Sequence, residues 1–94
     1  MYRIIKPRGG GKTEEIIQLA EENDAIVICQ NPRIYQKMAT IRGWNDDIMF
    51  VSYEDYLNKQ YDYNDKTTIL IDEIDGLLQC LKGNIIGYSL SEED

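Results

Sequence analysis

Short apolar segments alternate with segments of helical periodicity along this chain of 94 residues. The apolar segments are four or five residues long and lack regular polar alternation, which is typical of parallel strands covered on both faces. They occupy residues 2–5, 25–29, 48–51, 68–71 and 84–88. Helices are expected at 12–22, from the Asn31-Pro32 pair to about 43, after Ser52, and at 74–83. We therefore expect residues 1–94 to form a single α/β domain with a five-stranded parallel sheet and a frayed tail at about 90–94.

A run of three glycines precedes a Lys-Thr pair, between the first expected strand and the first expected helix. Because glycine has no Cβ, successive backbone N–H groups in such a loop can turn inward around a polyphosphate. Lys12 would reach the β- and γ-phosphates, and the Thr13 hydroxyl would ligate Mg²⁺. The candidate phosphate-binding residues are Arg8, Gly9, Gly10, Gly11, Lys12 and Thr13. The full motif has another glycine where this chain has Lys6, so a flexible glycine-rich turn is the alternative interpretation.

Two carboxylates, Asp72 and Glu73, follow the apolar residues 68–71. An aspartate at the end of a strand can hold the water shell of Mg²⁺, and the next glutamate can orient or deprotonate an attacking water. Alternatively, both residues only open the next helix, where acidic side chains suit the helix dipole. Both motifs follow an apolar strand, in the order that a phosphate site requires. We therefore predict Lys12 and Glu73 as catalytic residues, and Thr13 and Asp72 as the residues that hold Mg²⁺.

With these residues the chain resembles P-loop ATPases of the additional-strand type. Gly11-Lys12-Thr13 is similar to their Walker A motif, and residues 69–73 are similar to their Walker B motif. The Pro-Arg-x-x-Gly-Lys-Thr form of residues 7–13 resembles phage terminase motors and small phage ATPases, and the Asp-Glu pair resembles superfamily 2 helicases. The resemblance implies a three-layer αβα fold, with strands numbered along the chain in the order 1-5-4-2-3. It also implies that Ser89, just past the fifth strand, senses the γ-phosphate.

The implied strand order leaves the first strand at an edge of the sheet, where its backbone groups lack a partner. A second copy of the chain or another protein is expected to cover this edge. Ten basic against seventeen acidic residues, a net charge of −7, oppose strong autonomous binding to nucleic acid. There is no apolar segment long enough to span a membrane. Since Met1 leads directly into the first strand without a signal peptide, a cytoplasmic protein is expected.

The leading functional hypothesis is a Mg²⁺-dependent ATP-binding protein with weak or partner-dependent ATPase activity. An arginine that stabilises the transition state would come from Arg3, Arg8, Arg33 or Arg42, or from another chain, and its absence costs orders of magnitude in rate. ATP is expected because the chain has no Asn-Lys-x-Asp motif for guanine, and the lack of histidine excludes histidine-based catalysis. The alternatives are a nucleoside or nucleotide kinase, although no acceptor-binding lid is visible, and a non-catalytic nucleotide-binding interaction module.

Overall fold

The centre of the molecule is a parallel sheet of three strands. A computed structural model describes residues 4–5 and 11–89 of the chain. The strands are β1 (Ile26–Cys29), β2 (Phe50–Ser52) and β3 (Ile69–Ile71), in the order β2-β1-β3. Val27 of β1 is paired with Phe50 on one side and with Leu70 on the other. Because all three strands are parallel, their carboxyl ends meet at one edge of the sheet.

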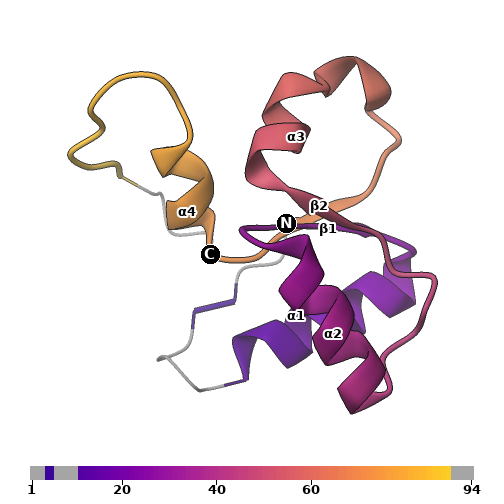
Figure 1. Cartoon of the computed structure of the whole chain (residues 1–94). Coiled ribbons are helices and arrows are strands. Elements are labelled where there is room, and N and C mark those ends of the chain that lie inside the picture. The colour runs from indigo at the N-terminus through magenta and orange to yellow at the C-terminus, as the bar shows by residue number, and fades with distance from the viewer. Residues whose placement is uncertain (1–3, 6–10, 90–94) are drawn as a thin grey trace, which may run out of the picture.

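Helices lie on both faces of the sheet. Figure 1 shows α1 (Lys12–Asn23) and α2 (Pro32–Arg42) on one face and α3 (Tyr53–Asn58) on the other. A short 3₁₀ helix, Gln60–Asp62, follows α3, and α4 (Ile74–Gln79) follows β3. In Figure 1, α4 and the segment after it lie to one side of the helices that pack on the sheet. No helix within residues 4–5 and 11–89 has the length and apolar character that are needed to cross a membrane.

Two side-chain caps begin the helices that follow the first two strands. The side chain of Asn31 accepts a hydrogen bond of 3.2 Å from the backbone N–H of Arg33, with Pro32 at the first helical position. The hydroxyl of Ser52 accepts a bond of 3.1 Å from the N–H of Asp55. Each cap satisfies an N–H group that has no partner inside its helix. The caps thus place the first turns of α2 and α3 at the carboxyl edge of the sheet.

The core lies between the sheet and the two helices α1 and α2. Val27, Ile28 and Cys29 of β1 have no exposed surface. The side chains that α1 buries recur at the three- and four-residue spacing of one helical face. The core cluster consists of Ile16, Ile17, Ala20, Ala25, Val27, Cys29, Ala39, Trp44 and Phe50. This packing fixes α1 against β1 and so holds the start of α1 near the carboxyl edge of the sheet.

The prediction of a five-stranded sheet in the order 1-5-4-2-3 is wrong, because the described residues form three strands in the order β2-β1-β3. Residues 84–88 form no strand, and neither do Ile4 and Ile5; the other residues of the first expected strand lie outside the described part. The fifth strand is missing because no apolar side chains of the described residues cover residues 84–88. Ile86 is 94% exposed, and α4 buries none of its residues. A strand within a parallel sheet needs apolar side chains packed on both faces, and nothing in this part of the chain supplies them.

Candidate functional site

The candidate site lies at the carboxyl edge of the sheet, next to the end of β3. β2 is the neighbour of β1 on one side, and the chain then crosses over so that β3 becomes its neighbour on the other side. Open α/β sheets bind ligands beside such a reversal of strand order, outside the carboxyl ends of the strands. The start of α1 lies at the same place, because Lys12 contacts Glu73 and Thr13 contacts Asp72. Four predicted site residues from two distant parts of the sequence are thus brought together.

Gly11 ends the glycine run and precedes α1. Its φ of 85° and ψ of 19° lie in the left-handed region. A Cβ at this position would have no neighbour within 4 Å, so glycine is favoured here by the backbone conformation and not by packing. The backbone amides that follow it, at the start of α1, can bind an anion together with the positive end of the helix dipole. Three other predicted loop residues lie outside the described part of the chain: Arg8, Gly9 and Gly10.

Thr13 and Asp72 are joined by a hydrogen bond across 59 positions of the sequence. The Thr13 hydroxyl donates to Oδ2 of Asp72 at 3.1 Å. Asp72 is only 3% exposed, and its backbone N–H donates to the carbonyl of Ile28 at 3.0 Å. This backbone bond fixes Asp72 beside the central strand. The pair therefore places a hydroxyl and a buried carboxylate side by side at the start of α1, and both are the hard oxygen ligands that Mg²⁺ prefers.

Tyr35 is a member of the site that the sequence analysis did not predict. Its hydroxyl donates a hydrogen bond of 2.5 Å to the same Oδ2 atom of Asp72. Burial, together with the hydrogen bond to Asp72 and the charge of that carboxylate, raises the pKa of Tyr35 above its ordinary value, so the hydroxyl stays protonated. No sequence spacing relates Tyr35 to Asp72. The only available signal was the cap at Asn31, which starts α2 at the carboxyl edge and so brings its first turn near the site.

Lys12 and Glu73 form an ion pair at the surface of the site. The lysine side chain is 25% exposed and the glutamate side chain is 56% exposed. Ion pairs with this degree of exposure contribute little to stability, because water screens the charges and both side chains lose rotamer freedom. Lys12 can therefore exchange Glu73 for an anionic ligand at low cost. The exchange would also free the glutamate for another role.

Tyr53, at the start of α3, fixes the backbone that carries both carboxylates. Its hydroxyl lies 2.6 Å from the carbonyl oxygen of Asp72 and 2.9 Å from that of Glu73, and it donates to both. The tyrosine is 4% exposed, and burial followed by the charge of Asp72 raises its pKa to about 12. Glu73 itself has a φ of 57°, a backbone conformation that residues other than glycine adopt only at a cost in free energy. The Tyr53 hydroxyl stabilises this turn.

Cys29 ends β1 beside the site but is not a reactive group. Its thiol is fully buried. Burial and the nearby charge of Asp72 raise the pKa of Cys29 to about 12, so the reactive thiolate is absent at neutral pH. Cysteine-based nucleophilic chemistry at this position is therefore not supported.

The oxygen atoms of the site suit a cation that arrives with an anionic ligand. Within residues 4–5 and 11–89, no three His, Cys, Asp or Glu side chains gather as a metal-binding group. A metal held by protein side chains alone therefore does not fit this part of the chain. Mg²⁺ instead is commonly bound by one or two protein oxygens together with waters and substrate phosphates. Thr13 and Asp72 fit that second pattern.

Other residues predicted for the site are not brought to it. Ser89 is exposed, and residues 84–88 directly before it form no strand. Arg42 forms an ion pair with Glu14, and its guanidinium lies over the Trp44 ring at 5.7 Å from the centroid. Arg33 is exposed on the first turn of α2. Arg3 and Arg8 lie outside the described residues, so among the described residues no arginine contacts Lys12, Thr13, Asp72 or Glu73.

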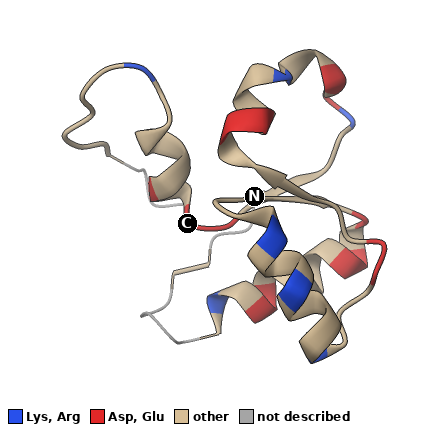
Figure 2. Ribbon diagram, viewed as in Figure 1, with Lys and Arg blue, Asp and Glu red and all other residues tan. Residues whose placement is uncertain are grey.

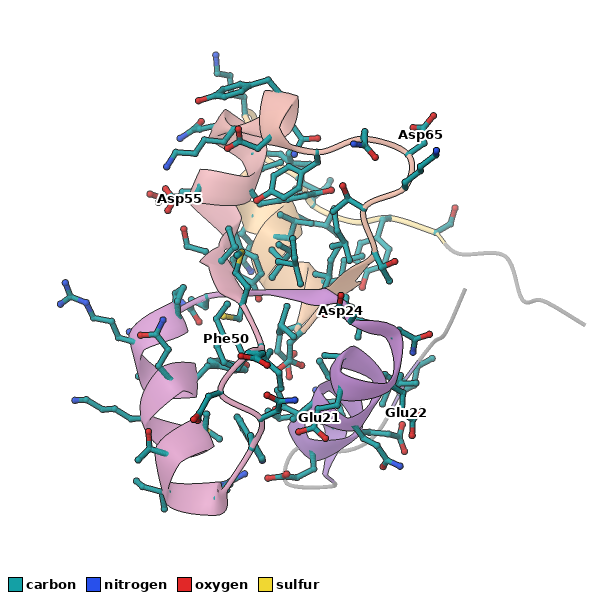
Figure 3. The ribbon with its side chains drawn as sticks, turned by 90° about the vertical axis from the view of Figure 1, so that its right-hand side faces the viewer. Glu21, Glu22, Asp24, Phe50, Asp55 and Asp65 are labelled. Carbon is teal, nitrogen blue, oxygen red and sulfur yellow. The ribbon has the colours of Figure 1, made fainter. Side chains whose placement is uncertain are left out.

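Figure 2 shows acidic and basic residues on the helices and loops of the described chain. In Figure 3, acidic side chains lie on different parts of the molecule, at the end of α1, on α3 and in the loop that precedes β3. The acidic residues labelled there are Glu21, Glu22, Asp24, Asp55 and Asp65.

A comparison of the chain with models of protein families, with curated proteins and with solved structures gives no match. The geometry of Lys12, Thr13, Asp72 and Glu73 is therefore the basis for inferring a function.

Proposed function

We propose that this chain binds a nucleoside triphosphate together with Mg²⁺ at the carboxyl edge of its sheet and hydrolyses it slowly. One observation carries the proposal. Thr13 at the start of α1 and Asp72 after β3 are hydrogen-bonded at 3.1 Å, directly beside the ion pair of Lys12 and Glu73. A helix start, a lysine, a hydroxyl and two carboxylates are the groups that phosphoryl transfer from a nucleotide requires.

Each side chain has a distinct role in the proposed site. Lys12 leaves Glu73 and binds the β- and γ-phosphates, while the amides at the start of α1 donate to phosphate oxygens. Thr13 and Asp72 hold Mg²⁺, which neutralises charge on the phosphate oxygens when it is bound. Glu73, released from Lys12, orients a water molecule toward the γ-phosphate and accepts its proton. ATP is the proposed nucleotide, since the chain has no guanine-reading motif.

Slow turnover follows from the position of the arginines. No arginine follows Arg42 in the sequence, and Arg42 itself is paired with Glu14. Stabilisation of the transition state by an arginine is worth several orders of magnitude in rate. We therefore propose that a second copy of the chain or a protein partner supplies this group, and that the isolated chain hydrolyses ATP weakly.

Calorimetric titration with ATP in the presence of Mg²⁺ tests the binding step. We expect the wild-type chain to bind with a dissociation constant in the micromolar range and Lys12→Ala to bind at least about tenfold more weakly, because a charge-assisted contact is lost. Lys37→Ala is the matched control, since it removes an exposed lysine from α2 and should leave the affinity unchanged. If the folded wild-type chain binds no nucleotide, or if both variants lose affinity equally, the proposal fails.

A further inference from the structure

We propose that Tyr35 is a positioning residue of the cation site, which it prepares by fixing the carboxylate of Asp72. This inference rests on the proposed function and adds to it a residue from a third part of the chain. Tyr35 belongs to α2, whereas Thr13 lies in the first turn of α1 and Asp72 follows β3. The hydroxyls of Tyr35 and Thr13 both donate to one oxygen, Oδ2 of Asp72, at 2.5 and 3.1 Å.

Two donors on one carboxylate oxygen restrict the rotation of the carboxylate group. They fix the plane of the Asp72 carboxylate and thereby the directions in which its oxygen lone pairs point. Asp72 is 3% exposed, so water contributes little to this orientation. The carboxylate is held in place before any ligand arrives, which lowers the cost of ordering it during binding.

The tyrosine ring is itself anchored. Its centroid lies 5.6 Å from that of Phe50, with an angle of 49° between the two rings, and Phe50 belongs to the buried core. This tilted arrangement is favourable for aromatic pairs. Because the Tyr35 ring packs on the core, its hydroxyl holds the Asp72 carboxylate in a fixed position. The Tyr35 hydroxyl thus contacts the proposed cation site only as a hydrogen-bond donor to the Asp72 carboxylate.

The variant Tyr35→Phe separates the packing of the ring from the hydrogen bond to Asp72, since it keeps the ring on Phe50 and removes only the hydroxyl. We expect the Mg²⁺ concentration at half-maximal ATP binding to rise about tenfold, in line with the loss of a hydrogen bond to a charged group. ATP affinity measured in excess chelator, without Mg²⁺, should remain within about twofold of the wild type, because Tyr35 acts on the carboxylate and not on the phosphates. Tyr61→Phe is the matched control, since it removes the hydroxyl of a tyrosine that is 80% exposed.

The two affinities distinguish the possible results. An unchanged Mg²⁺ dependence in Tyr35→Phe would overturn the inference while leaving the proposed function intact. An equal loss of affinity with and without Mg²⁺ would also overturn it, because a general structural defect would weaken both. If the wild-type chain binds no Mg·ATP, the proposed function and this inference fail together. Circular dichroism of each variant establishes that the compared proteins are folded.

Discussion

The ring of Tyr53 occupies the space in which a side chain at position 76 would begin. A Cβ built on Gly76 would lie 2.7 Å from Cε2 of Tyr53 and 3.0 Å from its hydroxyl oxygen. That hydroxyl donates to the carbonyls of Asp72 and Glu73, so the glycine leaves room for the tyrosine that fixes the turn after β3. The backbone position of Asp72 and Glu73 therefore depends on Gly76, which makes room for Tyr53 but contacts neither carboxylate group.

Gly76→Ala should destabilise the protein. In a helix interior, alanine is normally favoured over glycine by roughly 0.5–1 kcal/mol. Here the added methyl group would displace the buried Tyr53 ring, and overpacking of this kind costs about 1–3 kcal/mol. We expect the free energy of unfolding, measured by urea titration, to fall. Gly87→Ala is the control, because a Cβ at position 87 would meet nothing within 4 Å. A stabilised Gly76→Ala variant would show that Tyr53 moves freely.

Asp72→Asn should weaken nucleotide binding only when Mg²⁺ is present. The amide oxygen can still accept hydrogen bonds from Thr13 and Tyr35, but the negative charge that attracts the cation is lost. We expect the affinity for Mg·ATP to fall at least about tenfold by calorimetry, a loss that corresponds to about 1.4 kcal/mol. Asp75→Asn changes an exposed carboxylate three positions further along and serves as the control. Equal affinities of the two variants would remove Asp72 from the cation site.

Glu73→Gln should separate binding from hydrolysis. The loss of a general base typically lowers the rate by about 10²–10⁴-fold. At the same time Lys12 loses its charged partner, so ATP should bind at least as tightly as it does to the wild type. Single-turnover hydrolysis of labelled ATP, measured beside calorimetry, reports both quantities. Glu54→Gln, on the exposed surface of α3, is the comparison variant. A Glu73→Gln protein that hydrolyses ATP at the wild-type rate would exclude Glu73 as the base.

Alkaline pH should destabilise the fold through Cys29. Its pKa is about 12 in the folded chain against an ordinary value of 9.0, so the folded state binds the proton more tightly than the unfolded state. The stabilisation is complete below pH 9 and is lost as the pH rises from about 9 toward 12. From this group alone, the free energy of unfolding should fall by about 1 kcal/mol per pH unit within that range. Urea titrations at pH 8, 9.5 and 10.5 test this, and an unchanged stability would contradict it.

The sequence predicts the elements that a local pattern specifies. The β-branched segment 25–29 lies in the core as β1, and Asn31-Pro32 begins α2 with the expected cap. The residue before α1 is a glycine in the left-handed conformation, as a glycine-rich loop suggests. The two motifs predict that Lys12, Thr13, Asp72 and Glu73 belong to one site, whereas the direct contacts of Lys12 with Glu73 and of Thr13 with Asp72 are seen only in the structure. In these cases, backbone propensity and tertiary packing favour the same structure.

The remaining features depend on packing partners that a local pattern does not reveal. Residues 84–88 have the composition of a buried strand, but Ile85 and Ile86 are exposed, and no second layer formed by the described residues covers them. The last helix was expected to reach residue 83, yet α4 ends at Gln79, and none of its residues is buried. Tyr35 and Tyr53 reach Asp72 from helices that start at the same edge of the sheet. Their involvement could be recognised only once the order of the strands was known.

The position of β3 has a consequence for the order of folding. β3 is the last strand of the described chain, yet it pairs with β1, the first strand, so a long loop must close before the sheet is complete. A partly folded chain that contains only α1, β1, α2 and β2 would carry Lys12 and Thr13 but neither of their carboxylate partners. Contacts of such long sequence separation form late and slow the folding reaction. A ligand that contacts both Lys12 or Thr13 and the two carboxylates would therefore bind only the fully folded chain, and its binding would report on the completion of folding.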